Sequence, residues 1–380
     1  MEKRTYQAQD LVSIAKREQN KKRNYLVLNR LQGKHIPVSP GQALSMFAQL
    51  AETCREWVVP EQTLLIGFAE TATAIGAAAA AKLGTRYIQT TRETLAEASY
   101  LYFQEEHSHA AEQRLVKNGI DAILPKIRQI VFVEDEVTTG NTILNIISTL
   151  EKEYKANLSY AVASILNGMD SLAQQRYQNR NIRLFYLVKT DHFDYPKKAE
   201  QYKQTGTYLL PEHLPLSQAH VLEYTVSGGL DARKLLSAAA YEKACLHLWE
   251  EVKRQLPALP KGNVLVLGTE EFMYPALFCA RMIEEAGANV WFHATTRSPI
   301  AVFNEAQYPL HTRYELPSLY EKERRTFLYE IRAYDHVLIL TDAPKKERAG
   351  IEALVRAAAT CNQEISVVWW EHRQEEIKGM

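Results

Sequence analysis

The stretch IVFVEDEVTTGNTILNIISTL, residues 130–150, decides the fold that the rest of the chain is expected to adopt. It opens with four apolar residues, Ile130 to Val133, which are typical of a strand buried on both faces. After a polar segment, apolar residues from Ile143 to Leu150 recur at helical spacing. A buried strand, a tight turn and a helix in this order predict one unit of a parallel α/β sheet.

The polar segment joins two acids to a loop rich in threonine. Glu134 and Asp135 are expected at the carboxyl end of the strand, where open α/β sheets bind their ligands. The loop TTGNT, residues 138–142, brings hydroxyl groups and backbone amides to a helix N-terminus, and Gly140 lets those amides converge on an anion. The acids would repel a phosphate in the loop unless they bind sugar hydroxyl groups, so the pattern indicates a phosphoribosyl group.

Two further segments are expected at the same edge of the sheet. A strand over residues 63–66 breaks at Gly67, and an alanine-rich helix begins near Thr71. The next strand ends in TTR, residues 90–92, where Arg92 offers two parallel hydrogen bonds to a phosphate. These segments are placed to hold the other end of a large phosphorylated ligand. The chain has no GxxxxGK[ST] and no GxGxxG motif, which argues against P-loop and dinucleotide-binding proteins.

The strand, double acid and threonine-rich loop resemble the PRPP-binding motif of type I phosphoribosyltransferases, especially the orotate-like branch. The resemblance implies that Glu134 and Asp135 hold the ribose hydroxyls and that Mg²⁺ binds with PRPP, these two acids being its candidate protein ligands. It implies a 5′-phosphate site made of Thr138, Thr139, Gly140, Asn141 and Thr142. It implies a pyrophosphate site made of Phe68, Ala69, Glu70, Thr71 and Arg92.

Two features depart from the resembled family. Glu70 faces the expected pyrophosphate site, where an acid is unfavourable unless Mg²⁺ intervenes or the side chain caps the helix. Thr138 stands where purine-salvage relatives place an aspartate that faces the base, which favours the orotate-like branch.

The segment from Glu93 to about Asn118 falls where the resembled family has its flexible catalytic loop. It contains Glu106, His107 and His109, which we predict to be catalytic as a proton acceptor or a hydrogen-bond donor to the diphosphate. A metal site and an ordinary solvated loop are the alternatives.

The C-terminal part repeats the order of the first. VLVLGTEEF from Val264 parallels LLIGFAETA from Leu64, FHATTR parallels YIQTTR, and HVLILTD from His336 parallels the PRPP strand. Parallel strands are therefore expected at 264–267, 290–293, 337–340 and 365–369. Pro344 and two lysines replace the glycine turn, so this copy is expected to lack the phosphate nest. Convergent α/β patterning is the alternative.

The string TTRSP, residues 295–299, resembles the two-domain phosphoribosyltransferases named for a C-terminal Thr-Arg-Ser-Pro (TRSP) domain. The resemblance implies an α/β fold: a type I phosphoribosyltransferase-like parallel sheet with helices on both faces, followed by a second Rossmann-like α/β domain that is a degenerate copy. The domains are expected at 1–216, which binds PRPP, and at 217–380. This family is associated with tellurite-resistance gene clusters and with the biosynthesis of a nucleoside-like metabolite.

Six residues outside the motifs are candidate substrate contacts. Lys34 and His35 lie in a loop that could reach over the site, although ordinary solvated residues are an equal alternative. Thr295, Thr296, Arg297 and Ser298 form a hydroxyl-rich strand end beside an arginine. An ion pair that ties the two domains together is the alternative for Arg297.

Composition limits the partners. Lys plus Arg and Asp plus Glu number 45 each, which predicts no nucleic-acid or membrane partner. No long apolar run or signal peptide is recognised and the four cysteines are scattered, which predicts a cytoplasmic protein. A homodimer is also expected. We expect an enzyme that transfers phosphoribose from PRPP, or a close analogue, to a small base-like acceptor and releases pyrophosphate. A non-catalytic PRPP or nucleotide sensor is the alternative.

Overall fold

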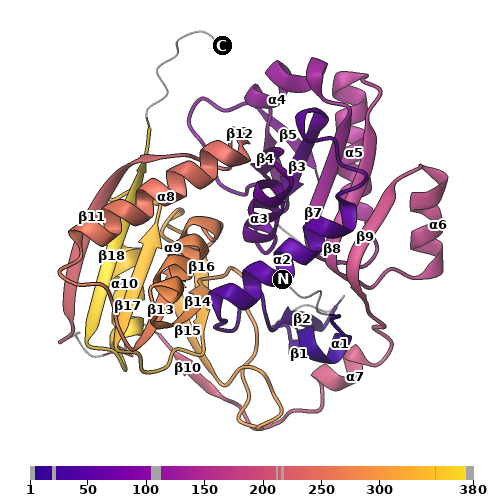
Figure 1. The fold of residues 1–380 in the computed structure, drawn as a ribbon. Helices are drawn as coiled ribbons and strands as arrows, with labels where there is room; N and C mark the ends of the chain where they lie inside the picture. Colours follow the sequence, from indigo (N-terminus) through magenta and orange to yellow (C-terminus); the bar gives the residue numbers. More distant parts are fainter. Residues whose placement is uncertain are drawn as a thin grey trace.

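The structure is a computed structural model that describes residues 5–18, 23–103, 113–210, 213–214, 218–346 and 348–373. Two α/β bodies pack against each other, the first carrying most residues up to about 210 and the second most residues from 220 onward (Figure 1). Within the described residues, no helix has the length and apolarity needed to cross a membrane. Each of the two bodies contains a largely parallel sheet packed with helices, which confirms the predicted α/β class with a second domain.

The first body is built on a six-stranded sheet of order β12-β4-β3-β7-β8-β9. All neighbours pair in parallel except the short β12, which is antiparallel to β4. The strands are β3 (Thr63–Gly67), β4 (Arg86–Gln89), β7 (Gln129–Val137), β8 (Ser159–Asn167), β9 (Arg183–Lys189) and β12 (Leu236–Ser237). The central β7 is apolar from Ile130 to Val133 because neighbouring elements cover both of its faces.

Helices of the first body follow the predicted strands. They are α2 (Pro40–Cys54), α3 (Thr73–Leu83), α4 (Asn118–Ile123), α5 (Asn141–Tyr154) and α6 (Ser171–Asn179), with the 3₁₀ turns η1 (Pro60–Gln62) and η2 (Leu124–Lys126). The pair Ser39-Pro40 is typical of a helix start and predicts a helix to about Cys54, which α2 confirms, with proline at its first position. The alanine run of α3 packs against α2, α8 and α9, because small side chains allow close approach from several sides.

The polar composition of residues 1–23 predicts an exposed helix or partly ordered arm, followed by a strand over 24–28. The first of these predictions is wrong. The segment forms α1 (Ala8–Leu11) and β1 (Val12–Lys16), and β1 pairs antiparallel with β2 (Tyr25–Asn29). The strand predicted at 24–28 thus exists, but in this separate two-stranded sheet. Leu11 and Ala15 are fully buried, so apolar contacts outweigh the polar composition of the segment. We call β1, β2 and their connection the hood.

The polar composition and three prolines of the stretch from Tyr195 to Gln218 predict an irregular connector, which is partly wrong. It contains α7 (Tyr195–Ala199) and β10 (Thr207–Leu209), and β10 joins a three-stranded sheet with β15 (Thr312–Pro317) and β16 (Arg325–Tyr329). Strand propensity alone does not find β10, because its partners lie about a hundred residues away. Nearer the site, β5 (Tyr100–Phe103) and β6 (Gln113–Val116) form an antiparallel pair on either side of residues 104–112.

The second body has a five-stranded parallel sheet of order β11-β18-β17-β13-β14. Its elements are β11 (His220–Gly229), α8 (Ala238–Gln255), β13 (Asn263–Gly268), α9 (Tyr274–Glu285), β14 (Asn289–Ala294), β17 (His336–Thr341), α10 (Arg348–Ala359) and β18 (Glu364–His372). The four predicted parallel strands are confirmed. Their order β14-β13-β17-β18 matches β4-β3-β7-β8, but the fifth strand, β11, precedes them in the chain whereas β9 follows.

The edge of the second sheet that corresponds to the PRPP site is filled by the protein itself. Asp342 follows β17, as Asp135 does the apolar part of β7, and accepts hydrogen bonds from Arg233 Nη2 at 2.6 Å and from the Tyr320 hydroxyl at 2.5 Å. Burial opposes ionisation, but Arg233, His372 and Tyr320 hold the pKa of the Asp342 carboxyl well below its usual range. In this second copy, where the phosphate nest was expected to be lost, the Asp342 carboxylate is paired with side chains of the protein itself.

A single apolar core joins the two bodies. It runs from Leu65 and Ile66 of the first sheet through α2, α3, α8 and α9 to Val264 and Val266 of the second. Strands β10 and β12 each join a sheet on the other side of the residue 216 boundary. The division into 1–216 and 217–380 remains our proposal.

Candidate active site

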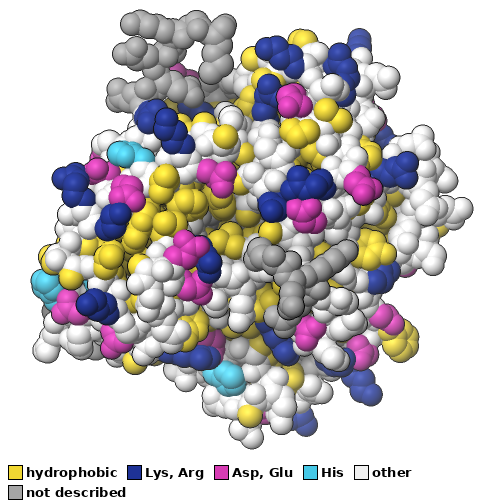
Figure 2. All heavy atoms as spheres, viewed as in Figure 1, with side chains coloured by type: hydrophobic (Ala, Val, Ile, Leu, Met, Phe, Trp, Pro, Cys, Tyr) yellow, Lys and Arg dark blue, Asp and Glu magenta, His cyan; other side chains and the backbone are white. Residues whose placement is uncertain are grey.

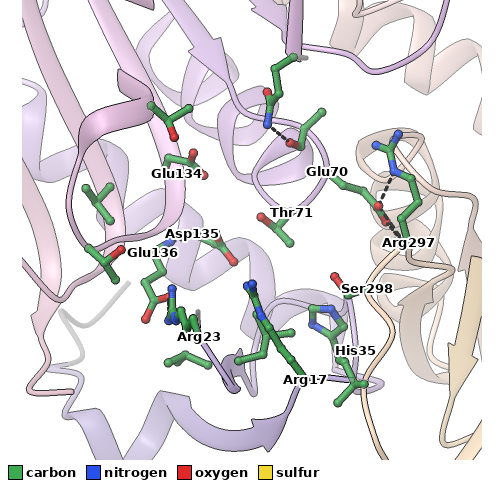
Figure 3. A pocket seen from close by; sticks show the side chains of 18 of the residues that line it. Arg17, Arg23, His35, Glu70, Thr71, Glu134, Asp135, Glu136, Arg297 and Ser298 are labelled. Atoms are coloured by element: carbon green, nitrogen blue, oxygen red, sulfur yellow. Dashed lines mark hydrogen bonds and ion pairs between the residues drawn. The ribbon is translucent and has the colours of Figure 1, made fainter. Parts of the chain in front are cut away.

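A cavity of about 450 Å³ opens at the carboxyl edge of the first sheet. Four segments line it: the hood, the β3–α3 loop with Arg92, the β7–α5 loop, and residues 297–300 of the second body (Figure 3). On the face of the molecule in Figure 2, basic and acidic side chains are intermixed without a patch of one sign.

The threonine-rich loop between β7 and α5 has the geometry of an anion site. Thr138, Thr139, Gly140 and Thr142 line the cavity, whereas the Asn141 side chain turns toward α6. Gly140 precedes α5 with φ 72°, and a Cβ there would lie 2.4 Å from the Tyr177 hydroxyl. Only glycine satisfies both the left-handed backbone and this close approach.

Helix α6 supports the loop from behind. Arg176 donates to Asn141 Oδ1 at 2.8 Å and to the Thr139 carbonyl at 3.1 Å, and the Tyr177 hydroxyl donates to the Gly140 carbonyl at 2.6 Å. These bonds fix the conformation of the loop on α6. The sequence carried no signal for Arg176 and Tyr177, because their helix lies more than thirty residues further along the chain.

Three acids of β7 line the cavity, one more than the motif suggested. Strand β7 does not end at Val133 as expected but continues to Val137. Glu134, Asp135 and Glu136 are therefore part of the strand, where successive side chains alternate in direction, and all three line the cavity. Glu136 accepts from Arg23 Nη2 of the hood at 2.6 Å. Asp135 accepts from the Glu136 amide at 2.9 Å, and Thr71 also hydrogen-bonds to its side chain.

Asp135 has little cationic compensation. Burial, and then the charge of Glu136, raises the pKa of the Asp135 carboxyl to about 6. A buried carboxylate in this state favours a ligand that brings positive charge or hydroxyl donors. Oxygen ligands from Asp135 and Glu134, completed by substrate oxygens and water, fit the preferences of Mg²⁺.

The predicted pyrophosphate loop is held in place by a polar network. The Ala69 amide donates to Thr90 Oγ1 at 2.8 Å, Thr90 donates to Gln113 Oε1 at 2.6 Å, and Gln113 donates to the Ala69 carbonyl at 2.9 Å. Ala69, Glu70, Thr71, Gln113 and Arg92 line the cavity. Phe68 does not: its ring packs in the core against Phe103 and Phe132.

The charge of Glu70 is compensated by Lys34 and by Arg297 of the second body, instead of by pyrophosphate-bound metal or a helix cap. Its carboxylate pairs with Lys34 and with Arg297 Nε at 2.8 Å, and it also accepts from the Arg297 amide (Figure 3). Burial opposes ionisation, but Lys34 and Arg297 hold the pKa of Glu70 well below its usual range. The acid in this loop is thus an anchor for the TRSP segment.

Arg297 joins a larger buried ion-pair cluster between the bodies. Arg297 Nη2 lies 2.7 Å from Glu271, whose other oxygen accepts from Thr91 at 2.7 Å. Arg324 pairs with Glu93 at 2.6 Å and with Glu270 at 3.0 Å. The interdomain ion pair, weighed as the alternative role of Arg297, is therefore present, although Arg297 also borders the cavity.

The other candidate contacts separate into two groups. His35 and Ser298 line the cavity. Lys34 is fully buried and donates to the carbonyls of Glu270 and Thr295 at 2.6 and 2.8 Å, and Thr295 and Thr296 lie outside the cavity in the interface. Burial and ion pairing leave Lys34 no path to a substrate. The three proposed catalytic residues, Glu106, His107 and His109, lie outside the described residues.

Two family models match the sequence in succession. The first, described as "Phosphoribosyl transferase", matches residues 11–191, and the second, described as "TRSP domain C terminus to PRTase_2", matches residues 232–358. The chain belongs to the TRSP-domain phosphoribosyltransferases. It is therefore a phosphoribosyltransferase, and its chemistry is phosphoribosyl transfer from PRPP.

Solved phosphoribosyltransferase structures resemble the first body of this TRSP-domain phosphoribosyltransferase. Adenine phosphoribosyltransferase from Rhodothermus marinus is 12% identical, with 48% of this chain and 96% of that chain covered and a TM-score of 0.33. Adenine phosphoribosyltransferase from Trypanosoma brucei, in complex with AMP, pyrophosphate and ribose-5-phosphate, is 12% identical, with 47% of this chain and 76% of that chain covered and a TM-score of 0.34. Orotate phosphoribosyltransferase from Aeropyrum pernix is 14% identical, with 44% of this chain and 80% of that chain covered and a TM-score of 0.29. Scores this low assign no residue a role. No curated protein matches the sequence.

The ion-pair cluster makes the stability of the TRSP-domain phosphoribosyltransferase depend on pH. Burial, and then the charge of Glu271, raises the pKa of Glu93 to about 7. The folded protein therefore holds a proton on Glu93 that the unfolded chain, with a pKa near 4.5, has released, so this group stabilises the fold below about pH 4.5 and loses that contribution as the pH rises through 7. We expect Glu93→Gln to raise the melting temperature at pH 8 relative to wild type more than at pH 5.

The matched control is Glu321→Gln, which removes an exposed partner of Arg324 and should give the same difference from wild type at both pH values. A Glu93→Gln effect that is equal at pH 5 and pH 8 would contradict the assigned titration.

Proposed function

We propose that this phosphoribosyltransferase transfers the 5-phosphoribosyl group of Mg²⁺-bound PRPP, or a close analogue, to a small base-like acceptor and releases pyrophosphate. The observation that carries the proposal is the convergence, on one cavity, of the β7–α5 loop, the acids of β7 and the β3–α3 loop with Arg92. Each segment carries a group suited to one part of PRPP. The distances between these parts are set by neighbouring strands of one sheet.

The phosphate end is proposed to bind at the loop before α5. Thr138, Thr139, Gly140 and Thr142 would supply amides and hydroxyls to the 5′-phosphate, with Asn141 fixing the loop to α6. Glu134 and Asp135 would accept hydrogen bonds from the ribose hydroxyls. This arrangement orients C1′ toward the middle of the cavity.

The leaving group is proposed to bind at the β3–α3 loop. Backbone amides of Glu70 and Thr71 and the side chain of Arg92 would bind pyrophosphate. Ala69 would contribute by fixing the loop through its bonds to Thr90 and Gln113, and Phe68 by packing the loop onto the core. Mg²⁺, when bound through PRPP and the β7 acids, neutralises charge on the pyrophosphate. Because Glu70 is held by Lys34 and Arg297, its charge is largely compensated at this end of the cavity.

The proposed step is a substitution at C1′. The bond from C1′ to the pyrophosphate oxygen breaks and pyrophosphate leaves with the electron pair. A lone pair on an acceptor nitrogen forms the new bond to C1′, and the proton lost from that nitrogen passes to a base or to water. Closure of the cavity would exclude water from the cationic sugar, and we keep Glu106, His107 and His109 as the proposed catalytic residues of that closure.

The proposal extends to the setting of the enzyme. Four unpaired cysteines suit a reducing compartment, so we propose a cytoplasmic location. A homodimer, a role in making a nucleoside-like metabolite and an association with tellurite resistance also remain proposals.

Isothermal titration with PRPP and Mg²⁺, followed by a pyrophosphate-release assay over candidate bases, tests the proposal. We expect saturable binding that needs Mg²⁺ and pyrophosphate release that needs an acceptor. Binding without turnover on any acceptor would instead support a sensor, and absence of PRPP binding would reject the assignment of the cavity.

A further inference from the structure

The part of the cavity wall that PRPP leaves free under the proposed function comes from both bodies. It consists of hood residues, including Leu26 and Val27, the ring of His35, and the segment Ser298–Ile300. The hood is tied to that segment, because the Glu18 amide donates to the Pro299 carbonyl at 3.1 Å and the Ala301 amide donates to the Lys16 carbonyl at 3.0 Å. We call this wall the composite pocket. It is incomplete without the TRSP domain.

His35 is the buried polar group of the composite pocket that lacks a partner. Its side chain is 2% exposed, and neither ring nitrogen has a hydrogen-bond partner among the described residues. The ring lies beside Ser298 at the border of the cavity (Figure 3). A buried polar group without a partner is costly, and a ligand that pairs with the ring would remove that cost.

The position of His35 is fixed by its neighbours in the chain. Lys34 is anchored in the ion-pair cluster, and Val38 exchanges two backbone hydrogen bonds with Phe292 of β14 at 3.0 and 2.7 Å. The ring therefore stands on a segment bound to the second sheet, which is the kind of rigid support that recognition needs.

The charges around the composite pocket are already matched. Arg23 pairs with Glu136 at 2.6 Å, Glu18 pairs with Arg313 at 2.9 Å, and Arg17 also interacts with the rest of the protein. The ring of His35 is neutral at pH 7, since burial and then the charge of Lys34 lower its pKa to about 3. What the pocket offers is therefore a neutral donor and acceptor between apolar walls.

We infer that the composite pocket binds the acceptor, that the acceptor is a neutral planar heterocycle and not a carboxylate, and that His35 hydrogen-bonds to its edge. This inference rests on the proposed function. Leu26 and Val27 of the hood and Pro299 and Ile300 of the TRSP domain supply apolar surface for the ring. His35 is thereby a specificity-determining residue that the second domain holds in place.

Two pairs of probes that differ by one carboxylate test the inference: uracil against orotate, and nicotinamide against nicotinate. Each is titrated in the presence of Mg²⁺, ribose 5-phosphate and pyrophosphate, which occupy the remaining sites without permitting transfer. We expect each neutral probe to bind at least about tenfold more tightly than its carboxylate. His35→Phe should weaken the neutral probes by about tenfold, since the ring loses its hydrogen-bonding atoms.

His293→Phe is the matched control. His293 is also fully buried, and burial lowers its pKa to about 4, so the neutral ring has a single N–H. The Gly33 and Tyr329 carbonyls lie 3.2 and 2.9 Å from its two nitrogens, so this N–H has an acceptor in either tautomer, and the ring does not line the cavity. We expect His293→Phe to lower the melting temperature and leave the preference for neutral probes intact. His35→Phe should keep or raise the melting temperature, because it removes an unpaired buried group.

Three outcomes would overturn the inference: no binding of either neutral probe to wild type, equal or tighter binding of the carboxylates, or unchanged probe binding in His35→Phe. Titration of wild type with PRPP and Mg²⁺ separates this failure from that of the proposed function. If PRPP binds while the probes fail, only the acceptor assignment falls.

Discussion

Replacing Arg297 with methionine is expected to destabilise the protein by about 3–5 kcal/mol, the cost typical of removing one partner from a buried ion pair. Methionine keeps the aliphatic length but leaves Glu70 and Glu271 without the guanidinium that lies 2.8 and 2.7 Å from them. The free energy of unfolding, measured with urea, gives the loss. Arg297→Lys should recover only part of it, because one ammonium cannot reach both carboxylates in the geometry of a planar fork.

A control and a rescue make the interpretation specific. Arg281→Met removes an arginine of α9 whose pairs with Glu284 and Glu285 are substantially exposed, so its cost should stay below about 1 kcal/mol. Adding Glu271→Gln to Arg297→Met should restore part of the stability, since Glu271 has Arg297 as its cationic partner among the described residues, whereas Glu70 keeps Lys34. An Arg297→Met protein as stable as Arg281→Met would show that the cluster does not hold the bodies together.

Asp135→Asn is expected to weaken PRPP binding in the presence of Mg²⁺ by about tenfold to a hundredfold. Asparagine keeps the shape of the side chain but removes the charge from hydrogen bonds that are worth about 1.5–3 kcal/mol when one partner is ionised. Isothermal titration measures the loss.

The same substitution should raise the melting temperature at pH 7. Burial and the neighbouring Glu136 raise the pKa of Asp135, so the ionised carboxylate destabilises the folded state and its removal relieves that cost. Asp194→Asn, at an exposed carboxylate paired with Lys198, is the control and should change neither quantity. If PRPP affinity were unchanged while stability rose, Asp135 would be a strained buried acid without a binding role.

Arg297→Met is expected to lower the stability of the protein and Asp135→Asn to raise it, so the two residues are expected to have different roles. Arg297 is a positive charge that compensates several buried acids, whereas Asp135 is a buried acid that the protein leaves poorly compensated. The first pattern is that of an interface, and the second is that of a site prepared for a ligand.

Local sequence determined the strands, the loops and the chemistry of the motif. Residues 130–150 contain their own strand, glycine turn and helix within a single short stretch, so periodicity and backbone preference were sufficient to find them. The repeat of this order predicted the second parallel sheet. The N-terminal hood was missed because β1 has its partner β2 only after a polar connection, and pairing decides whether such a segment becomes a strand.

Only the tertiary structure decided which side chains face the ligand and which face each other. Lys34 and His35 are adjacent in sequence and looked equivalent. Lys34, however, binds Glu70 and two carbonyls, whereas the ring of His35 borders the cavity and has no hydrogen-bond partner in the part of the chain that the structure describes. Glu70 and Arg297 are separated by 227 residues, and neither predicts the other from local pattern. Sequence fixes the charge that a residue carries, but burial and the partners brought by the fold determine whether that charge is available.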